Sequence, residues 1–348
     1  MADPEHSNVS VLQPPGLRDQ LGRPLRDLRL SVTDRCNNRC PYCMPREQFE
    51  RFQFIRSDQR LSFPEILRLT RIFVRLGVRK LRITGGEPLL RQGLTELIGD
   101  LSQLSGVEDI ALATNGVLLA QHAAGLKAAG LHRVSVSLDS LDPEVFAHMT
   151  GGFGHPGVVL AGIQAARELG LTPIKVNAVI KRGVNDHTAL DLVEHFRGTG
   201  VVLRFIEYMD VGTRNAWRPE HVVPSAELIE RIDARWPVRP ADANYAGEVA
   251  ARYAFDDGAG EIGFISSVTR PVCRACTRAR LSADGVLYGC LFAPQGIDLR
   301  QRLRTGASDE DLCGVLQGFW KRRDDRYSEL RCAGCAPGPR PEMHRLGG

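Results

Sequence analysis

The stretch LRLSVTDRCNNRCPYC, residues 28–43, decides the fold class that this chain is expected to adopt. It opens with a short apolar and β-branched run at 28–33, which is typical of a buried strand. Cys36, Cys40 and Cys43 follow directly, in the pattern C-x3-C-x2-C. Three thiolates at this spacing suit a soft-metal site, either iron–sulfur or zinc. They also leave one position of a [4Fe–4S] cube unfilled, and a catalytic metal needs such an open position.

The first triple fits a structural zinc site less well, because such a site normally has a fourth Cys or His ligand close by. No Cys or His follows Cys43 within the next fifty residues. Unrelated buried cysteines would not show this tight spacing. The loop that leaves the first strand is also about 30 residues long, far above the usual connection, which indicates a functional loop.

The same rhythm of strand and helix continues outward along the chain. Apolar, β-branched runs predict further strands at 79–84, 108–113, 133–138, 174–180 and 201–207. Helical spacing is found at 64–76, 92–104, 117–129, 157–169 and 187–197, and later at 296–304 and 308–320. Strands that alternate with helices indicate parallel βαβ units. A doubly wound sheet and a partial barrel share this signature.

After about residue 240 the rhythm changes. A hairpin is predicted, with its turn near Asp256–Gly260. Cys273, Cys276 and Cys290 then form a second triple, C-x2-C-x13-C, without an obvious fourth ligand. A second iron–sulfur site and a zinc knuckle that uses a distant ligand both fit this spacing.

The composition places the chain among ordinary folded proteins. It has 348 residues, 43% of them apolar and 25% charged, with a net charge of +4. This charge is too small to indicate a nucleic-acid-binding protein. No apolar run approaches the ~20 residues of a membrane span, and the N-terminus lacks a signal-peptide pattern, so we expect a cytoplasmic protein. In a reducing cytosol, the nine cysteines indicate metal ligands rather than disulfides.

The first triple and the second strand carry a family resemblance. With Tyr42 before its last cysteine, the triple resembles that of the radical S-adenosylmethionine (SAM) enzymes, and Thr84-Gly85-Gly86-Glu87-Pro88 resembles their GGEP motif. The resemblance implies an α/β fold, a partial (β/α)6 TIM-type barrel with its chemistry at the carboxyl ends of the strands. It also implies a [4Fe–4S] cluster whose free iron chelates SAM, with Glu87 as an acceptor for the SAM ammonium group.

Polar residues stand at the other predicted strand ends, where such a site would lie: Asn115, Ser137, Asp139, Lys175, Asn177, Arg204 and Glu207. On this resemblance we divide the chain into three parts. Residues 1–16 form a disordered N-terminus, 17–240 the radical SAM barrel, and 241–348 a C-terminal extension that carries the second cluster and binds substrate.

The surroundings of the second triple are more specific. CTRARL at 276–281, DG at 284–285 and GCLF at 289–292 closely resemble the GTP 3′,8-cyclase family of molybdenum cofactor biosynthesis. Three further stretches resemble the same family: GRPLRDLRLS at 22–31, RFIEYMDVG at 204–212 and the terminal Gly347-Gly348. The resemblance runs from about residue 17 to the C-terminus.

This resemblance implies roles for individual residues. A second [4Fe–4S] cluster on Cys273, Cys276 and Cys290 would bind the guanine of GTP. The implied contacts to SAM are Tyr42, Gly86, Glu87, Ser137 and Met209. The implied contacts to GTP are Arg29, Lys80, Arg82, Lys175, Arg204, Arg278 and Arg280. Arg278 and Arg280 alternate on an extended segment, so both point the same way beside the cluster, and Arg suits phosphate by charge and bidentate geometry.

The implied reaction uses the cofactors rather than a protein nucleophile. A 5′-deoxyadenosyl radical from SAM removes the hydrogen at C3′ of GTP, and the ribose radical adds to C8 of guanine. A second electron and a proton give (8S)-3′,8-cyclo-7,8-dihydro-GTP. We therefore predict no catalytic residue beyond the cofactors. We also expect a homodimer, an electron donor that the sequence leaves unspecified, and a downstream cyclic pyranopterin monophosphate synthase, with no nucleic-acid or membrane partner.

Some residues depart from the pattern or allow a second interpretation. Ala113 stands where the family often has a Thr that contacts GTP. Cys313, Cys332 and Cys335 form a further set, for which free thiols are the simpler interpretation. Composition alone predicts a frayed Gly347-Gly348 end, whereas the resemblance implies that it reaches the active site. Two other functions stay open: a radical SAM peptide-modifying enzyme with an auxiliary cluster, and a non-enzymatic zinc-binding interaction module.

Overall fold

The computed structural model describes residues 16–245, 247–331 and 338–347. The predictions for the residues before 16, for Cys332 and Cys335, and for Gly348 lie outside the described residues. In the described part of the chain, no helix is long and apolar enough to cross a membrane.

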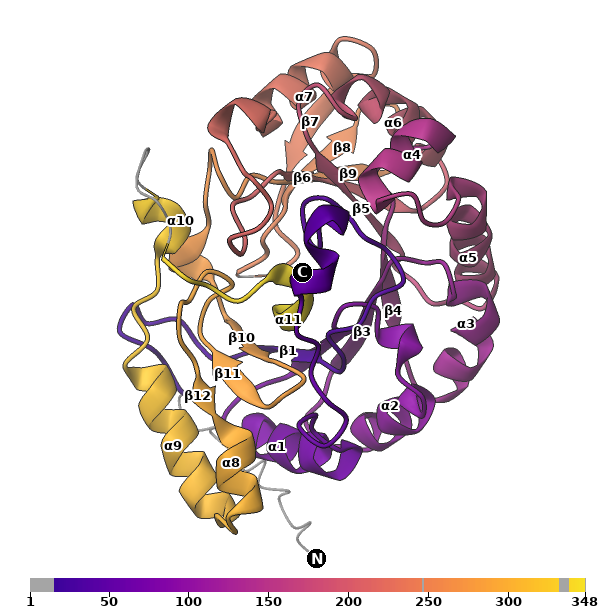
Figure 1. Cartoon of the computed structure of the whole chain (residues 1–348). Helices are drawn as coiled ribbons and strands as arrows, with labels where there is room; N and C mark the ends of the chain where they lie inside the picture. Colours follow the sequence, from indigo (N-terminus) through magenta and orange to yellow (C-terminus); the bar gives the residue numbers. More distant parts are fainter. Residues whose placement is uncertain (1–15, 246, 332–337, 348) are drawn as a thin grey trace, which may run out of the picture.

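A curved sheet organises the chain (Figure 1). Its strand order is β12-β11-β10-β1-β2-β3-β4-β5-β6-β9-β8-β7. The central strands run in chain order and pair in parallel: β1 (Asp27–Ser31), β2 (Lys80–Thr84), β3 (Asp109–Thr114), β4 (Arg133–Ser137), β5 (Lys175–Ile180) and β6 (Val202–Glu207). Each begins and ends within two residues of a predicted strand, so the prediction of parallel βαβ units is confirmed.

Helices cover the outer face of this sheet (Figure 1). The sequence predicts α1 (Phe63–Arg75), α2 (Leu94–Ser102), α3 (Leu119–Ala128), α5 (Pro156–Glu168) and α6 (Ala189–Phe196). It does not predict α4 (Pro143–Thr150) and α7 (Ser225–Asp233). The strands bury alternate residues against the helices, as a period of two requires. Leu28 and Leu30 are buried, whereas Arg29 between them lines the interior of the barrel.

Residues from 238 onward extend the sheet at one edge. β9 (Glu261–Ile265) pairs in parallel with β6, and β8 (Ala251–Phe255) and β7 (Val238–Ala241) follow in antiparallel order. The β8–β9 pair is the predicted hairpin, which is confirmed. The strands of this edge therefore continue the curvature that β1 to β6 begin.

The C-terminal part also supplies the opposite edge of the sheet. β10 (Arg278–Leu281) pairs in parallel with β1, and β11 (Val286–Tyr288) and β12 (Ile297–Asp298) follow it. α8 (Leu299–Arg304) and α9 (Asp309–Lys321) were expected, and α10 (Tyr327–Leu330) and α11 (Met343–Leu346) are additional short helices. Because β12 and β7 do not pair, the sheet is an open, partial barrel, and the predicted fold class is confirmed.

Candidate active site

A cavity of about 320 Å³ occupies the interior of the partial barrel. It is lined by both cysteine triples, Cys36, Cys40 and Cys43 with Cys273, Cys276 and Cys290. The first triple follows β1, and the second flanks the β10–β11 pair. Because β1 and β10 are neighbours in the sheet, the pairing brings together cysteines from opposite ends of the chain. The two predicted metal sites therefore share one space.

Burial dominates the chemistry of the first triple. It raises the pKa of the Cys36 thiol to about 11, and it raises the pKa values of Cys40 and Cys43 well above their usual range. A thiol must lose its proton to bind a metal, so a bound cation has to stabilise these thiolates. The backbone N–H of Cys43 donates to the carbonyl of Cys40 at 2.9 Å, which folds the ligand segment into a turn.

The second triple has a different electrostatic environment. Burial raises the pKa of the Cys276 thiol, but the positive charges of Arg278 and Arg323 outweigh this effect and lower the value to about 6. The guanidinium Nε of Arg278 lies 3.4 Å from Cys276 Sγ. Burial raises the pKa of Cys290 to about 11. The neighbouring guanidinium groups therefore favour the thiolate of Cys276, the form in which a cysteine binds a metal.

Four of the residues expected to contact SAM line the cavity: Tyr42, Gly86, Ser137 and Met209. The hydroxyl of Tyr42 donates to Asp139 Oδ2 at 2.8 Å, which fixes the ring. Burial raises the pKa of the Asp139 carboxyl to about 6. A Cβ on Gly86 would lie 2.2 Å from the carbonyl oxygen of Arg35, so the loop of the first triple leaves no room for a side chain there.

Glu87, also expected to contact SAM, is placed differently. It is fully buried and is not among the residues that line the cavity. Its Oε1 accepts from the Thr114 hydroxyl at 2.8 Å and from Leu89 N–H at 3.0 Å, and its Oε2 accepts from Asn115 N–H at 2.7 Å. Burial raises the pKa of this carboxyl to about 7. These contacts join the end of β2 to the end of β3. The expected contact of Glu87 with the SAM ammonium group stays a prediction.

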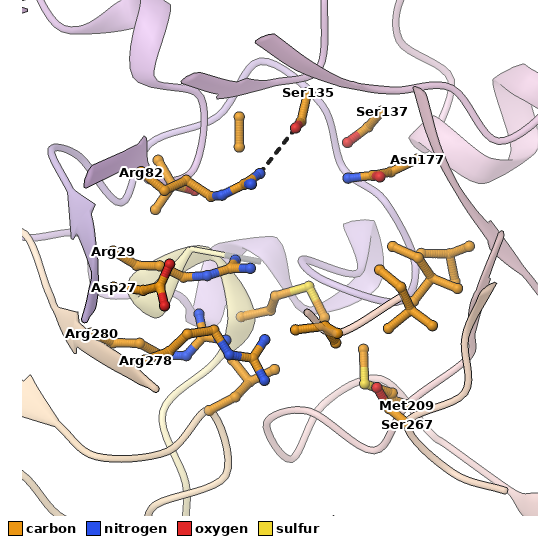
Figure 2. A pocket seen from close by; sticks show the side chains of 18 of the residues that line it. Asp27, Arg29, Arg82, Ser135, Ser137, Asn177, Met209, Ser267, Arg278 and Arg280 are labelled. Carbon is orange, nitrogen blue, oxygen red and sulfur yellow. Dashed lines mark hydrogen bonds between the residues drawn. The ribbon is translucent and has the colours of Figure 1, made fainter. Parts of the chain in front are cut away.

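A row of arginines forms one wall of the cavity (Figure 2). The parallel registers place Arg29 level with Arg280 on β10 and level with Arg82 on β2. Arg278 lies two residues before Arg280 and therefore shares its face, as predicted. Figure 2 shows these guanidinium groups reaching into the cavity from one side, with Ser137, Asn177 and Met209 on the other.

Of the residues expected to contact GTP, Lys80 and Arg204 also line the cavity, and Lys175 does not. Burial, followed by the charges of Arg204 and Arg133, lowers the pKa of Lys175 to about 7. Burial and neighbouring arginines likewise lower the pKa of Arg82 to about 10 and that of Arg280 to about 9. Like charges that are buried together destabilise one another, and a bound polyanion relieves this repulsion.

The C-terminal tail enters the same cavity. Met343 and His344 line it, and the His344 ring lies edge-on to Phe52 with centroids 4.9 Å apart. The carbonyl of Gly347 accepts from Arg280 Nη1 at 2.8 Å. Gly347 has a φ of +69°, and a Cβ there would lie 2.1 Å from Thr84 Cγ2. The tail is therefore packed as far as Gly347. That residue lies between Arg280, which is predicted to bind GTP, and β2, the strand that leads to the GGEP motif.

The sequence did not predict the contacts that Tyr245 and Glu248 make with two cationic residues, Lys80 and Arg204. Lys80 Nζ lies 3.4 Å from the ring centroid of Tyr245. Arg204 Nη2 pairs with Glu248 Oε1 at 3.1 Å, and Glu248 Oε2 accepts from Asn244 N–H at 2.8 Å. Two residues expected to bind the triphosphate are thus held by Tyr245 and Glu248. These lie in a connection without motif or periodicity, so no sequence signal identifies them.

Ala113 and Cys313, which the sequence also singled out, occupy different parts of the structure. Ala113 lines the cavity and offers no hydroxyl there. Cys313 packs against the hydrophobic core from α9. Within residues 16–245, 247–331 and 338–347, no three Cys, His, Asp or Glu side chains lie close enough together to hold one metal ion.

A partial barrel whose first loop carries C-x3-C-x2-C defines a radical SAM protein. The sequence signature of the Radical SAM superfamily matches residues 30–196, and the signature described as Molybdenum Cofactor Synthesis C matches residues 201–329. The fold resembles Streptococcus suis SuiB bound to S-adenosylmethionine, with a TM-score of 0.60 and 15% identity, over 93% of this chain and 78% of SuiB. As a radical SAM enzyme, the protein uses a [4Fe–4S] cluster and SAM.

Within that class, the chain belongs to the GTP 3′,8-cyclase family. It is 54% identical over 332 residues to GTP 3′,8-cyclase of Xanthomonas campestris, which covers 95% of this chain and 97% of the relative. The GTP 3′,8-cyclase of Acidothermus cellulolyticus is 53% identical, over 90% of this chain and 88% of the relative. That of Staphylococcus haemolyticus is 45% identical, over 90% of this chain and 93% of the relative.

Proposed function

We propose that this chain converts GTP to (8S)-3′,8-cyclo-7,8-dihydro-GTP, a step of molybdenum cofactor biosynthesis. The observation that carries the proposal is the shared cavity, in which both cysteine triples face a wall of arginines. Buried guanidinium groups suit a polyanionic nucleotide better than a peptide, which weighs against the peptide-modifying alternative. The identity of 54% to a GTP 3′,8-cyclase supports the same reaction.

The first triple and its neighbours would form the SAM side of the site. Cys36, Cys40 and Cys43 would hold a [4Fe–4S] cluster with one iron open to SAM. When bound, the cluster and SAM supply the carbon radical that starts the reaction. Tyr42, Gly86, Ser137 and Met209 would bind SAM, with Tyr42 held in place by Asp139. The hydrogen bonds of Glu87 keep the adjoining strand ends, and so the shape of this side, fixed.

We place a second [4Fe–4S] cluster on Cys273, Cys276 and Cys290, with the guanine of GTP at its open position. Two features support the fit. Arg278 and Arg323 favour the Cys276 thiolate, and the cavity is continuous from this triple to the first. A nucleotide held between the triples presents its ribose toward the SAM side. Such positioning turns an encounter into an effectively intramolecular step.

The cationic wall would orient the triphosphate of GTP. Four arginines face the cavity together: Arg29, Arg82, Arg278 and Arg280. Lys80 and Arg204 add further positive charge to the lining of the same cavity. Lys175 adds a buried amine beside Arg204. These groups bind and orient, and none has to act as a nucleophile. On this proposal the cofactors carry the chemistry.

The proposal extends to the tail and to the cellular setting. Gly347 and Gly348 would close the substrate side, since Gly347 already contacts Arg280. We propose that 17–240 binds SAM and that 241–348 binds the second cluster, with 1–16 outside both units. A cytoplasmic homodimer would deliver its product to a cyclic pyranopterin monophosphate synthase.

Anaerobic incubation of the full chain with SAM, dithionite and GTP tests the proposed function. We expect 5′-deoxyadenosine and cyclised GTP to form together, identified by mass spectrometry, and no cyclised product when ATP replaces GTP. SAM cleavage without any cyclised GTP would favour a different substrate, such as a peptide. A colourless protein with stoichiometric zinc would favour the zinc-binding alternative.

A further inference from the structure

Two segments of the chain carry the second cysteine triple, and within the first of them the N–H of Cys276 donates to the carbonyl of Cys273 at 3.1 Å. Cys273 begins the 3-10 helix Cys273–Ala275, Cys276 precedes β10, and Cys290 follows β11. The hydrogen bonds of the β10–β11 ladder join Arg280 with Tyr288 and Leu281 with Leu287, and stop short of the cysteines themselves. Some other set of contacts must therefore fix the cysteine segments relative to one another.

Two buried arginines make those contacts. Arg23 is 2% exposed, and its Nη1 donates to the carbonyl of Cys273 at 2.8 Å and to that of Asp325 at 2.7 Å. Arg323 is 4% exposed, and its Nη1 donates to the carbonyl of Cys276 at 3.0 Å. Arg323 Nε donates to the carbonyl of Gly289, the residue before Cys290, at 2.9 Å. The two guanidinium groups thus bind the backbone at Cys273 and Cys276 and at the residue before Cys290.

A single carboxylate joins the two arginines. Asp19 is buried, and its Oδ2 accepts from Arg23 Nε at 2.6 Å and from Arg323 Nη1 at 2.7 Å. We call Asp19, Arg23 and Arg323 the guanidinium cradle. The packing against it is close, because a Cβ on Gly289 would lie 3.2 Å from Arg323 Cδ and 2.6 Å from Asp325 Oδ2. Gly289 is therefore the residue that lets this strand end approach the cradle.

We propose that Arg23 and Arg323 are positioning residues that assemble the second metal site by holding together the two backbone segments that carry its three cysteines. The inference rests on the second cluster of the proposed function. Arg is suited to this task because its rigid fork can serve two carbonyls and one carboxylate at once, which the single ammonium of Lys cannot. The positive charges also lie beside a site of three thiolates, and charge and hydrogen bonds of this kind set the potential of an iron–sulfur centre.

The experiment isolates the second site in the full-length chain. In a background with Cys36, Cys40 and Cys43 changed to Ala, anaerobic reconstitution should give about four irons per chain. Arg23→Gln and Arg323→Gln in that background should lose iron to a chelator about tenfold faster or more, the range for removal of outer-shell contacts. Arg323→Lys keeps the charge and loses the fork, so it should fall between. Electron paramagnetic resonance of the reduced cluster should change in the Gln variants.

A matched control separates this effect from ordinary loss of an arginine. Arg68 Nε pairs with Asp309 at 2.7 Å and its Nη2 donates to the carbonyl of Ala307 at 2.7 Å, on the outside of the barrel. Arg68→Gln removes similar bonds far from either triple and should leave both iron retention and the spectrum unchanged. Asp19→Asn keeps both arginines and removes the charge that orients them, so it should weaken iron retention in the same direction.

The possible results distinguish the proposed second cluster from the proposed role of Arg23 and Arg323. If the background chain with an intact cradle binds no iron, the proposed second cluster is wrong. If that chain binds iron and the Gln variants match it in iron retention and in the spectrum, the inference is overturned. The reciprocal background, in which Cys273, Cys276 and Cys290 are changed to Ala, tests whether the cradle stabilises the fold as a whole. Equal loss of iron from the first site there, or failure of the variants to fold, would show that the cradle only stabilises the fold and would also overturn the inference.

Discussion

Arg29 on β1 and Arg280 on β10 are level with each other on neighbouring parallel strands, although one lies near the start of the chain and the other near its end. Both side chains face the cavity (Figure 2). Their spacing is set by strand pairing, which is more rigid than a loop. The cationic wall is thus a property of the sheet itself, and substitutions there should alter ligand binding with little effect on the position of the backbone.

Arg278→Ala and Arg280→Ala should each weaken GTP binding by about 1.5–3 kcal/mol, the range for hydrogen bonds to charged groups. The affinity for SAM should change little, because SAM is proposed to sit on the other triple. Isothermal titration of each variant with GTP and with SAM measures both affinities. Arg278→Lys is the matched variant: it keeps a point charge without the fork and should retain part of the binding. Equal loss of both affinities would indicate a folding defect.

Iron content should divide equally between the triples. The intact chain should contain about eight irons and eight sulfides after anaerobic reconstitution, and removal of either triple should leave about four. Loss of Cys36, Cys40 and Cys43 should abolish SAM cleavage. Loss of Cys273, Cys276 and Cys290 should abolish GTP cyclisation. The partly buried Cys313 is the control, and Cys313→Ala should change neither the iron content nor the products.

Glu248→Gln should destabilise the chain in a way that GTP repairs. The side chains of Arg204 and Glu248 are 12% and 1% exposed, and removing one partner of such a pair costs about 3–5 kcal/mol. The free energy of unfolding of the ligand-free variant should therefore fall. Saturating GTP supplies an anion to Arg204, so the difference from the intact chain should shrink. Glu194→Gln, which breaks the exposed pair with Arg235, should have little effect in either state.

If Glu248→Gln is equally destabilised with and without saturating GTP, Arg204 does not contact the triphosphate. Denaturant unfolding with and without GTP provides the measurement. The same comparison with GDP would show how far along the polyphosphate the contact lies.

GTP binding should take up a proton at pH 8. The pKa of Lys175 is lowered to about 7 in the folded chain, chiefly by burial, against about 10.4 in an unfolded chain. Between these values the folded chain binds fewer protons than the unfolded chain, so its stability falls progressively as the pH drops from about 10.4 to about 7, and this group has no further effect below that. A triphosphate nearby raises the pKa of Lys175, and up to about one proton should be bound.

Calorimetry in buffers of different ionisation enthalpy measures this proton uptake. At pH 8 the phosphates of GTP are already ionised and do not contribute. Lys175→Met should abolish the uptake. If the Met variant takes up as many protons as the intact chain, the nucleotide does not reach Lys175.

Gly347→Ala should impair cyclisation while both clusters and SAM cleavage remain. An added Cβ would meet Thr84, and a φ of +69° disfavours any side chain at this position. Removal of Gly347 and Gly348 should have the same effect, because the radical then forms without GTP held in place. Parallel assays of 5′-deoxyadenosine and cyclised GTP separate the two steps. Cyclisation at the intact rate would show that the tail is dispensable.

The central strands and most outer helices could be predicted because each carries a local period of hydrophobicity. α4 was missed because the connection between β4 and β5 was expected to hold one helix, and α7 because no helix was expected directly after β6. β10 was expected as an extended segment, whereas β11 and β12, of three and two residues, are too short to show alternation. The pairing of β1 with β10 is a contact between distant segments, which local patterns do not encode. The family motifs reached further, since they located the cysteines and arginines that this pairing brings together.

At the site, the sequence was informative about residue types and less so about their partners. The GGEP motif marks Glu87, yet the direction of its carboxylate depends on Thr114 and Asn115 from the next strand. Tyr245 and Glu248 follow no motif, and their relevance appears only from their contacts with Lys80 and Arg204. Packing of side chains from different strands decided these points.

The pairing of β1 with β10 also has a consequence for biosynthesis of the chain. Asp27 and Thr277 are 250 residues apart, and the Thr277 hydroxyl donates to the Asp27 carboxylate. During translation, β1 can pair with β2 early, but its other edge stays open until β10 has been made. At about 5–20 residues per second this interval lasts roughly 10–50 s. An open strand edge invites wrong pairing, so the nascent barrel passes through an aggregation-prone period that ends only when its last strands leave the ribosome.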